Sequence, residues 1–312
     1  MINYWRMFIF VVITLLLFGC NEDVEKPEIL LDENPVIFEH NGQQIEIYTF
    51  FDEYENFIEK AEKEPDNIKV LFQQEVMKAF GESTNHTVSL YEEISAPKDI
   101  DKVGEYLTRL KKQENNIDKW IKEALQDSVD NLPGEDKKVY IFPSFMEEEA
   151  SLKDLEYVGG LVLNKDGFIL EINPLFTERS LKYTVAHEYH HTVAMESGYS
   201  TTLLERSVLE GKADTFSKTI YPEMEPAWLQ SLSGYYKEHG WEIFMENLNS
   251  EESEMWHFLF NGNHFKGIAK WTNYKIGYEI MQSFLKENRD VSIEEWTKMS
   301  AQDILAKSQY AD

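Results

Sequence analysis

The chain has 312 residues, with 30 Lys and Arg against 57 Asp and Glu, which gives a formal net charge of −27. Such an acidic chain lacks the clustered cations that contact nucleic-acid phosphates, so we expect no nucleic-acid partner. A hydrophobic content of 42% excludes a wholly disordered chain, and the single cysteine excludes an internal disulfide framework and a Cys-rich metal cluster.

The N-terminus has the pattern of a secretion signal. An apolar run over residues 7–18 ends at Gly19-Cys20, and this run is shorter than the roughly 20 apolar residues of a spanning helix. A small residue before a lone cysteine resembles a bacterial lipoprotein cleavage site. We therefore expect a signal peptide at 1–19 and lipidation of Cys20, which anchors the protein on the extracytoplasmic face of a bacterial cell membrane. The alternatives are a plain membrane anchor and a cysteine that is buried by chance.

A tether and a first hairpin follow. Residues 20–35 are charged and contain two prolines, as a tether does. The next segment, 36–49, alternates apolar and polar residues around Asn41-Gly42, which predicts a β-hairpin. Apolar side chains then recur every three to four positions in two stripes, which predict helices in the N-terminal region 36–135. The stripes cover residues 68–80 and 103–125.

The second half of the chain, 136–312, predicts a small antiparallel sheet followed by helices. A short strand at 139–142 and a hairpin at 161–172 precede a helix over about 177–197, which Gly198 can end. Further helical segments cover about 203–218, 235–248, 267–287 and a last pair near the C-terminus. The predicted fold class is therefore α+β and mostly α.

The helix over 177–197 carries a metal-binding pattern, HEYHH. His187 and His191 are four residues apart, so both rings lie on one helix face and can bind one Zn²⁺. Glu188 lies beside the metal and can take a proton from a water, which is the logic of the HExxH motif. His190 shares a face with His187 too, but the His187–His191 pair leaves Glu188 correctly placed. We expect His190 to be exposed or to lie behind the ligands.

A catalytic zinc site needs a third protein ligand, and the next helix offers one. After His191 the next histidine is His239, so the third ligand of the HExxHxxGxxH pattern is missing. In the segment LEGKAD, Glu210 and Asp214 are four residues apart, so one can bind zinc while the other accepts the N–H of a ligand histidine.

Other interpretations of this segment remain open. Glu205 is a competing ligand on a different helix face, and the acidic residues of LEGKAD can also be an ordinary solvated surface. The small residues Gly211 and Ala213 are expected to let this helix approach the HEYHH helix closely.

HEYHH followed by LEGKAD, with a hairpin before the first helix, resembles the gluzincin metallopeptidases. More closely, residues 136–310 resemble a bacterial family of predicted zinc-dependent proteases that is catalogued as a domain of unknown function. The resemblance implies a zincin-like core and one Zn²⁺ per chain, with Glu188 as the catalytic base and Asp214 as the partner of His187. The implied zinc ligands are His187, His191 and Glu210.

The expected function is a membrane-anchored zinc metallopeptidase that acts on a peptide or protein. Its oxyanion would need a donor besides the metal, and Tyr274, Tyr278, His257 and His264 are the candidates. The strand at 161–163 can also pair with an extended peptide. The alternative function is a non-catalytic surface lipoprotein of the same fold that binds a metal or a partner.

Overall fold

The computed structural model describes residues 35–84, 94–145, 153, 156–198 and 201–311. The expected signal peptide, Cys20 and almost all of the tether lie outside the described residues. Within the described ranges, no helix is both long and apolar enough to cross a membrane.

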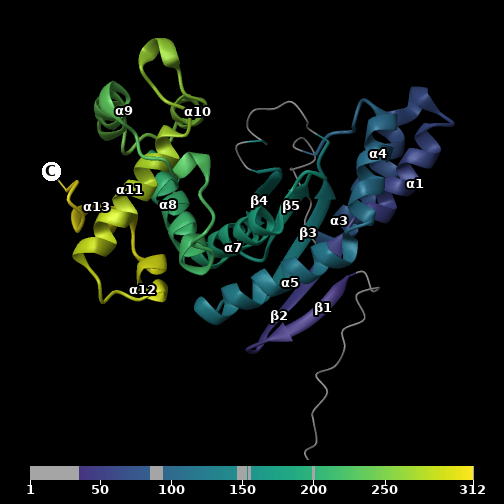
Figure 1. Ribbon diagram of the computed structural model, residues 1–312, viewed down its shortest axis with the longest axis horizontal. Coiled ribbons are helices and arrows are strands. Elements are labelled where there is room, and N and C mark those ends of the chain that lie inside the picture. Colours follow the sequence, from purple (N-terminus) through teal and green to yellow (C-terminus); the bar gives the residue numbers. More distant parts are fainter. Residues whose placement is uncertain (1–34, 85–93, 146–152, 154–155, 199–200, 312) are drawn as a thin grey trace, which may run out of the picture. The chain divides into compact units, whose positions relative to one another are not determined.

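The strands that precede the HEYHH helix form one five-stranded mixed sheet (Figure 1). Two antiparallel hairpins, β1–β2 and β4–β5, lie on either side of β3, and β3 runs parallel to β2 and to β5. The order across the sheet is β1 (Val36–His40), β2 (Gln43–Thr49), β3 (Lys137–Pro143), β5 (Gly167–Ile172) and β4 (Val158–Asn164).

The predicted α+β, mostly helical fold class is confirmed, and both predicted hairpins form. Asn41 and Gly42 have positive φ angles of 50° and 82°, as a tight two-residue turn requires. The sheet is mixed rather than antiparallel, because β3 joins the two hairpins through parallel pairing. Strands from both sides of residue 135 therefore share one sheet.

The two predicted N-terminal helical stripes are each divided into shorter helices. A π-helical segment, Gln73–Met77, interrupts the first stripe, and a turn at Lys112–Gln113 interrupts the second. The turn lets α4 contact α1 while α5 contacts the HEYHH helix. The helices are α1 (Phe51–Ala61), α2 (Ile68–Phe72), α3 (Lys78–Thr84), α4 (Ile100–Lys111) and α5 (Glu114–Asn131).

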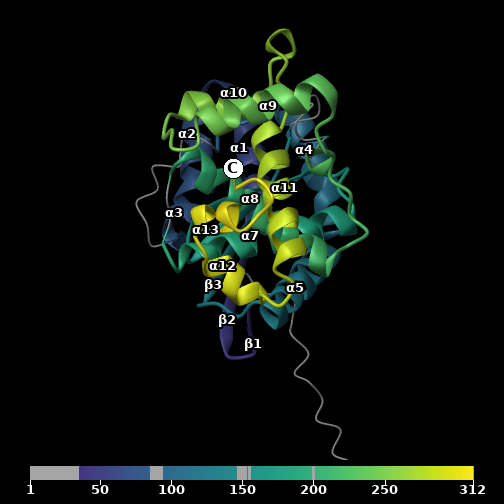
Figure 2. The same cartoon turned by 90° about the vertical axis from the view of Figure 1, so that its left-hand side faces the viewer.

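The HEYHH helix, α7 (Glu178–Met195), contacts β4 and β5 as well as α5 and α8 (Figure 1). α8 in turn contacts α11, and α9 and α10 both contact α11 (Figure 2). These helices are α8 (Leu203–Ile220), α9 (Gly234–Glu246), α10 (Ser253–Asn261), α11 (Thr272–Glu287), α12 (Ile293–Lys298) and α13 (Ala301–Ala306).

Buried polar contacts fix α7 against the sheet. The Tyr189 hydroxyl donates to the side-chain carbonyl of Gln43 on β2 at 2.9 Å. Lys137 of β3, which is 1% exposed, forms an ion pair with Glu196 at the end of α7 at 2.5 Å. The N-terminal hairpin therefore helps to hold the helix that carries HEYHH.

The buried carboxyl group of Asp118 on α5 should make the stability of the fold depend on pH. This residue is 4% exposed, and burial raises the pKa of its carboxyl group from 3.8 to about 7; Glu114 adds to the increase and a hydrogen bond from Thr49 opposes it. The folded state thus binds the proton more tightly than the unfolded state, so this group destabilises the fold as the pH rises from about 4 to 7. Asp118→Asn should raise the free energy of unfolding at pH 8 by up to about 4 kcal/mol.

Urea denaturation of wild type and Asp118→Asn at several pH values measures this effect. The gap between the two proteins should narrow as the pH falls from about 7 to about 4 and close below that, where the wild-type carboxyl is protonated in both states. A gap that is independent of pH would contradict the assignment.

Candidate metal centre

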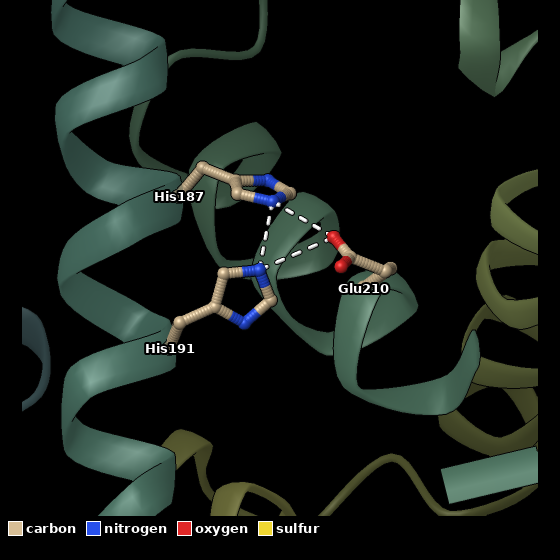
Figure 3. Close-up of side chains that lie close together, drawn as sticks. All are labelled: His187, His191 and Glu210. Atoms are coloured by element: carbon tan, nitrogen blue, oxygen red, sulfur yellow. Dashed lines mark hydrogen bonds and ion pairs between the residues drawn. The ribbon is translucent and has the colours of Figure 1, made fainter. Parts of the chain in front are cut away.

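α7 brings the two histidines of the motif together. It begins at a capping box, in which the Thr177 hydroxyl accepts from the Ser180 N–H at 3.1 Å and the Ser180 hydroxyl accepts from the Thr177 N–H at 3.0 Å. One turn apart on the same face, His187 and His191 are 8% and 7% exposed. Figure 3 shows their rings pointing toward Glu210, which α8 supplies.

Three donor atoms converge on one point. The Nε2 atoms of His187 and His191 are 3.0 Å apart, and Oε2 of Glu210 lies 3.1 Å from the first and 3.2 Å from the second. Ligands held 2.0–2.1 Å from one tetrahedral ion are about 3.3–3.4 Å apart, and the observed spacings are shorter than this by about 0.1–0.4 Å, so a small outward shift of the side chains admits zinc. Within the described residues, these three are the one group of His, Cys, Asp and Glu side chains close enough to hold a metal ion.

Asp214 determines which atom of His187 is free to bind a metal. It is fully buried, and its carboxylate lies 3.2 Å from Nδ1 of His187. The same carboxylate accepts hydrogen bonds from the Tyr183 hydroxyl at 2.9 Å and from Nε1 of Trp228 at 3.0 Å. With its proton on Nδ1, His187 presents the lone pair of Nε2 to the other two donor atoms. Three lone-pair donors without a shared proton repel one another, and a cation between them removes that repulsion.

The electrostatics also favour positive charge at this point. Burial alone lowers the pKa of His187, but Asp214 and Glu210 outweigh it and hold that pKa well above its ordinary value. Burial raises the pKa of Glu210, but His191 and His187 outweigh it and the pKa is lowered. The donor set, spacing and charge thus all fit a divalent cation.

Residues 117–306 match a protein family described as Predicted Zn-dependent protease (DUF2268). The chain belongs to this family. No curated protein and no solved structure matches it. The matched range contains all three cluster residues and Asp214, and it begins inside α5, the helix that packs against α7.

In this member of the family, a close helix crossing positions Glu210. Gly211, the next residue, lies against the backbone of Gly277 on α11, where a Cβ atom would collide with the Gly277 carbonyl. The expectation that the small residues of LEGKAD admit α7 is therefore wrong for Gly211. The reason is that Glu210 and Gly211 lie about 100° apart around α8, so they face different neighbours.

Glu188 lies beside the cluster, with its side chain against β4. It is 7% exposed, and a Cβ atom on Gly160 of β4 would collide with its carboxylate. Burial raises the pKa of Glu188, although His187 and His191 lower it. Glu188 and His187 also line one cavity, so a molecule in the cavity reaches both side chains.

Of the four predicted oxyanion donors, Tyr274 lies closest to this arrangement. It lines the same cavity, and burial together with the neighbouring carboxylates, Glu210 first, raises its pKa well above the ordinary value. Tyr278 lines a separate surface groove, and burial raises its pKa, with Asp214 adding to the increase. His257 and His264 are exposed and are not among the residues that line the cavity.

The competing ligands of the sequence analysis have other contacts. His190 is fully buried, which excludes the exposed position and leaves the one behind the ligands. Its ring lies 6.3 Å from that of His191 and stacks on Trp296 with 5.4 Å between centroids. The Glu205 carboxylate accepts from the backbone N–H of Ala301 at 3.2 Å, at the start of α13.

Sequence reasoning missed Tyr183 and Trp228, the two residues that hold Asp214. Tyr183 lies one turn before His187 on the same helix, so helical spacing alone placed it on the ligand face. Trp228 comes from a short 3₁₀ turn, Ala227–Leu229, which Lys275 of α11 holds by donating to the backbone carbonyls of Ala227 and of Gln230, the residue after the turn. A tryptophan in such a turn carries no local signal of its role.

Proposed function

We propose that this protein is a zinc-dependent metallopeptidase in which His187, His191 and Glu210 hold one Zn²⁺ and Glu188 is the general base. The observation that carries the proposal is the triangle of donor atoms 3.0–3.2 Å apart, with Glu188 beside it in an open cavity. A purely structural zinc site uses four protein ligands and needs neither a cavity nor an adjacent carboxylate. Three ligands next to a cavity leave a position for chemistry.

Each residue of the site has a separate role in hydrolysis. Bound zinc supplies a Lewis acid that polarises a carbonyl group and makes water more acidic. Glu188 takes a proton from the attacking water as its oxygen bonds to the carbonyl carbon, then gives that proton to the leaving nitrogen as the C–N bond breaks. Asp214 keeps the proton of His187 on Nδ1, and we assign the oxyanion donor to Tyr274 because it lines the same cavity.

β4 supports a peptide as the substrate. It is an edge strand of the sheet, paired with β5 on one side, and its residue Gly160 lies against Glu188. An extended peptide that pairs with the outer edge of β4 would pass directly over Glu188. This geometry favours peptide bonds over other hydrolysable groups.

Metal removal tests the proposal. The chain should purify with one zinc per molecule and cleave a mixed peptide library; a chelator should abolish both, and added Zn²⁺ should restore both. Elemental analysis and mass spectrometry of the library provide the two measurements. A chain that holds zinc and cleaves nothing would be the non-catalytic binding protein instead, and a chain that takes up no zinc would overturn the ligand assignment.

We also propose that a lipid on Cys20 anchors the protein to the outer surface of the bacterial cell membrane. Loss of residues 1–19 removes Arg6 and leaves the chain still more acidic, so its surface repels anionic lipid headgroups and the acyl chains must hold it there. Cys20→Ser should move the protein from the membrane fraction to the soluble fraction or leave its signal uncleaved. Unchanged fractionation and processing would contradict lipidation.

A further inference from the structure

The cavity beside His187 and Glu188 has an aromatic wall. Its volume is about 170 Å³. Four distant segments supply the wall: Tyr183 comes from α7, Trp228 from the 3₁₀ turn, Phe260 from α10, and Trp271 from the residue that precedes α11. The rings of Phe260 and Trp271 pack edge to face, with centroids 4.3 Å apart.

The size and polarity of this cavity define its occupant. An apolar protein cavity of about 150 Å³ holds one benzene ring, so 170 Å³ admits one side chain of that size. The polar atoms of Tyr183 and Trp228 are already bound to Asp214, whereas Nε1 of Trp271 is buried and has no hydrogen-bond partner among the described residues. Among the residues that the structure describes, no Lys or Arg lines the cavity. The other polar side chains of the lining are Thr184, His187, Glu188 and Tyr274, so a charged or strongly polar side chain that packs against the four aromatic rings would lose hydration that those rings do not replace.

The wall is also held in place before any ligand enters. Asp214 fixes Tyr183 and Trp228 by hydrogen bonds, and Lys275 fixes the backbone of the Trp228 turn. Trp271 is held in a left-handed conformation, with φ at 64°, which is costly for a residue other than glycine. A preformed wall discriminates by shape, because it does not readjust around a smaller or larger guest.

We propose that this cavity is a specificity pocket that selects substrates with one neutral, single-ring or similarly sized apolar side chain, such as Phe, Leu or Met, directly beside the cleaved bond. The inference rests on the proposed peptidase function, because it places the side chain next to Glu188 and the metal ligands. Burial of one such side chain corresponds to a preference of about 10- to 100-fold over Gly.

A peptide series tests the pocket. The peptides are identical except for Gly, Leu, Phe, Trp, Lys or Glu on either side of the cleaved bond, and kcat/KM is measured with the zinc-loaded chain. Phe and Leu at one of the two positions should exceed Gly by about 10- to 100-fold, while Lys and Glu do not exceed Gly. Equal rates for Phe and Gly, or a preference for Lys or Glu, would overturn the proposal.

Two variants and a matched control test whether the side-chain preference arises from this cavity. Phe260→Ala enlarges the pocket and should shift the optimum from Phe to Trp. Thr184→Phe fills the pocket from α7 and should remove the preference for Phe. Phe258→Ala, on the same helix but outside the cavity lining, should change neither. Identical profiles for Phe260→Ala and Phe258→Ala would contradict the assignment.

A binding measurement separates the pocket from the peptidase activity. N-acetyl-phenylalanine amide should bind the zinc-loaded wild type saturably, followed by NMR line broadening, and should bind Phe258→Ala but not Thr184→Phe. Binding without hydrolysis of any peptide would refute the proposed function and support the pocket. Hydrolysis with neither side-chain preference nor binding would refute the pocket and leave the function standing.

Discussion

Replacement of Glu188 with Gln should reduce peptide hydrolysis about 10²- to 10⁴-fold while zinc content stays at one per chain. Gln has nearly the same shape as Glu, but its amide cannot accept the proton of the attacking water. The metal should stay bound because the three donor atoms of the cluster come from other residues. Zinc analysis and cleavage of the same peptide library, measured on one preparation, check both parts.

His187→Ala is the contrasting variant. It removes a metal donor atom and leaves Asp214 buried without one of its three hydrogen-bond donors, so both zinc and activity should be lost. If Glu188→Gln also lost its zinc, Glu188 would be part of the metal site. If it kept its activity, another group would be the base.

The sequence predicted the part of the site that a single helix determines. His187 and His191 share one face of α7 because helical geometry fixes residues four apart, and helix formation required only local signals such as the Thr177 cap. The step to Glu210 was longer, since it required a turn after α7 and a second helix running back. In the structure, Oε2 of Glu210 lies 3.1 Å from Nε2 of His187. The spacing along the chain allows this contact, and long-range packing of the helices produces it.

Features that depend on distant segments were not predictable in the same way. The parallel pairing of β3 with β2 joins strands nearly 90 residues apart, and strand pattern alone does not specify the neighbour. The aromatic wall of the cavity combines α7, the Trp228 turn, α10 and the start of α11. Each of these aromatic residues has the pattern of an ordinary core residue in its own segment, because buried packing and ligand contact use the same side chains.

Gly277→Ala, at the crossing of α8 and α11, should lose both stability and metal binding. A Cβ atom on Gly277 would collide with the backbone carbonyl of Ser207, and backbone atoms cannot move aside as a flexible side chain can. The two helices must therefore separate, at a cost of about 3 kcal/mol or more. Because Gly211 lies at the same crossing and follows Glu210 directly, the separation should also move Glu210 away from the histidines and lower zinc affinity.

Gly104→Ala is the matched control, because it makes the same change within helix α4. There a Cβ atom would meet only Cγ2 of Ile58, at an ordinary contact distance of 3.9 Å. Alanine is the better helix former, so this variant should be neutral or more stable by about 0.5–1 kcal/mol, with unchanged zinc affinity. Urea denaturation and zinc titration of the two variants compare the effects directly. If Gly277→Ala behaved like Gly104→Ala, α8 and α11 would not be in backbone contact, and another feature would have to position Glu210.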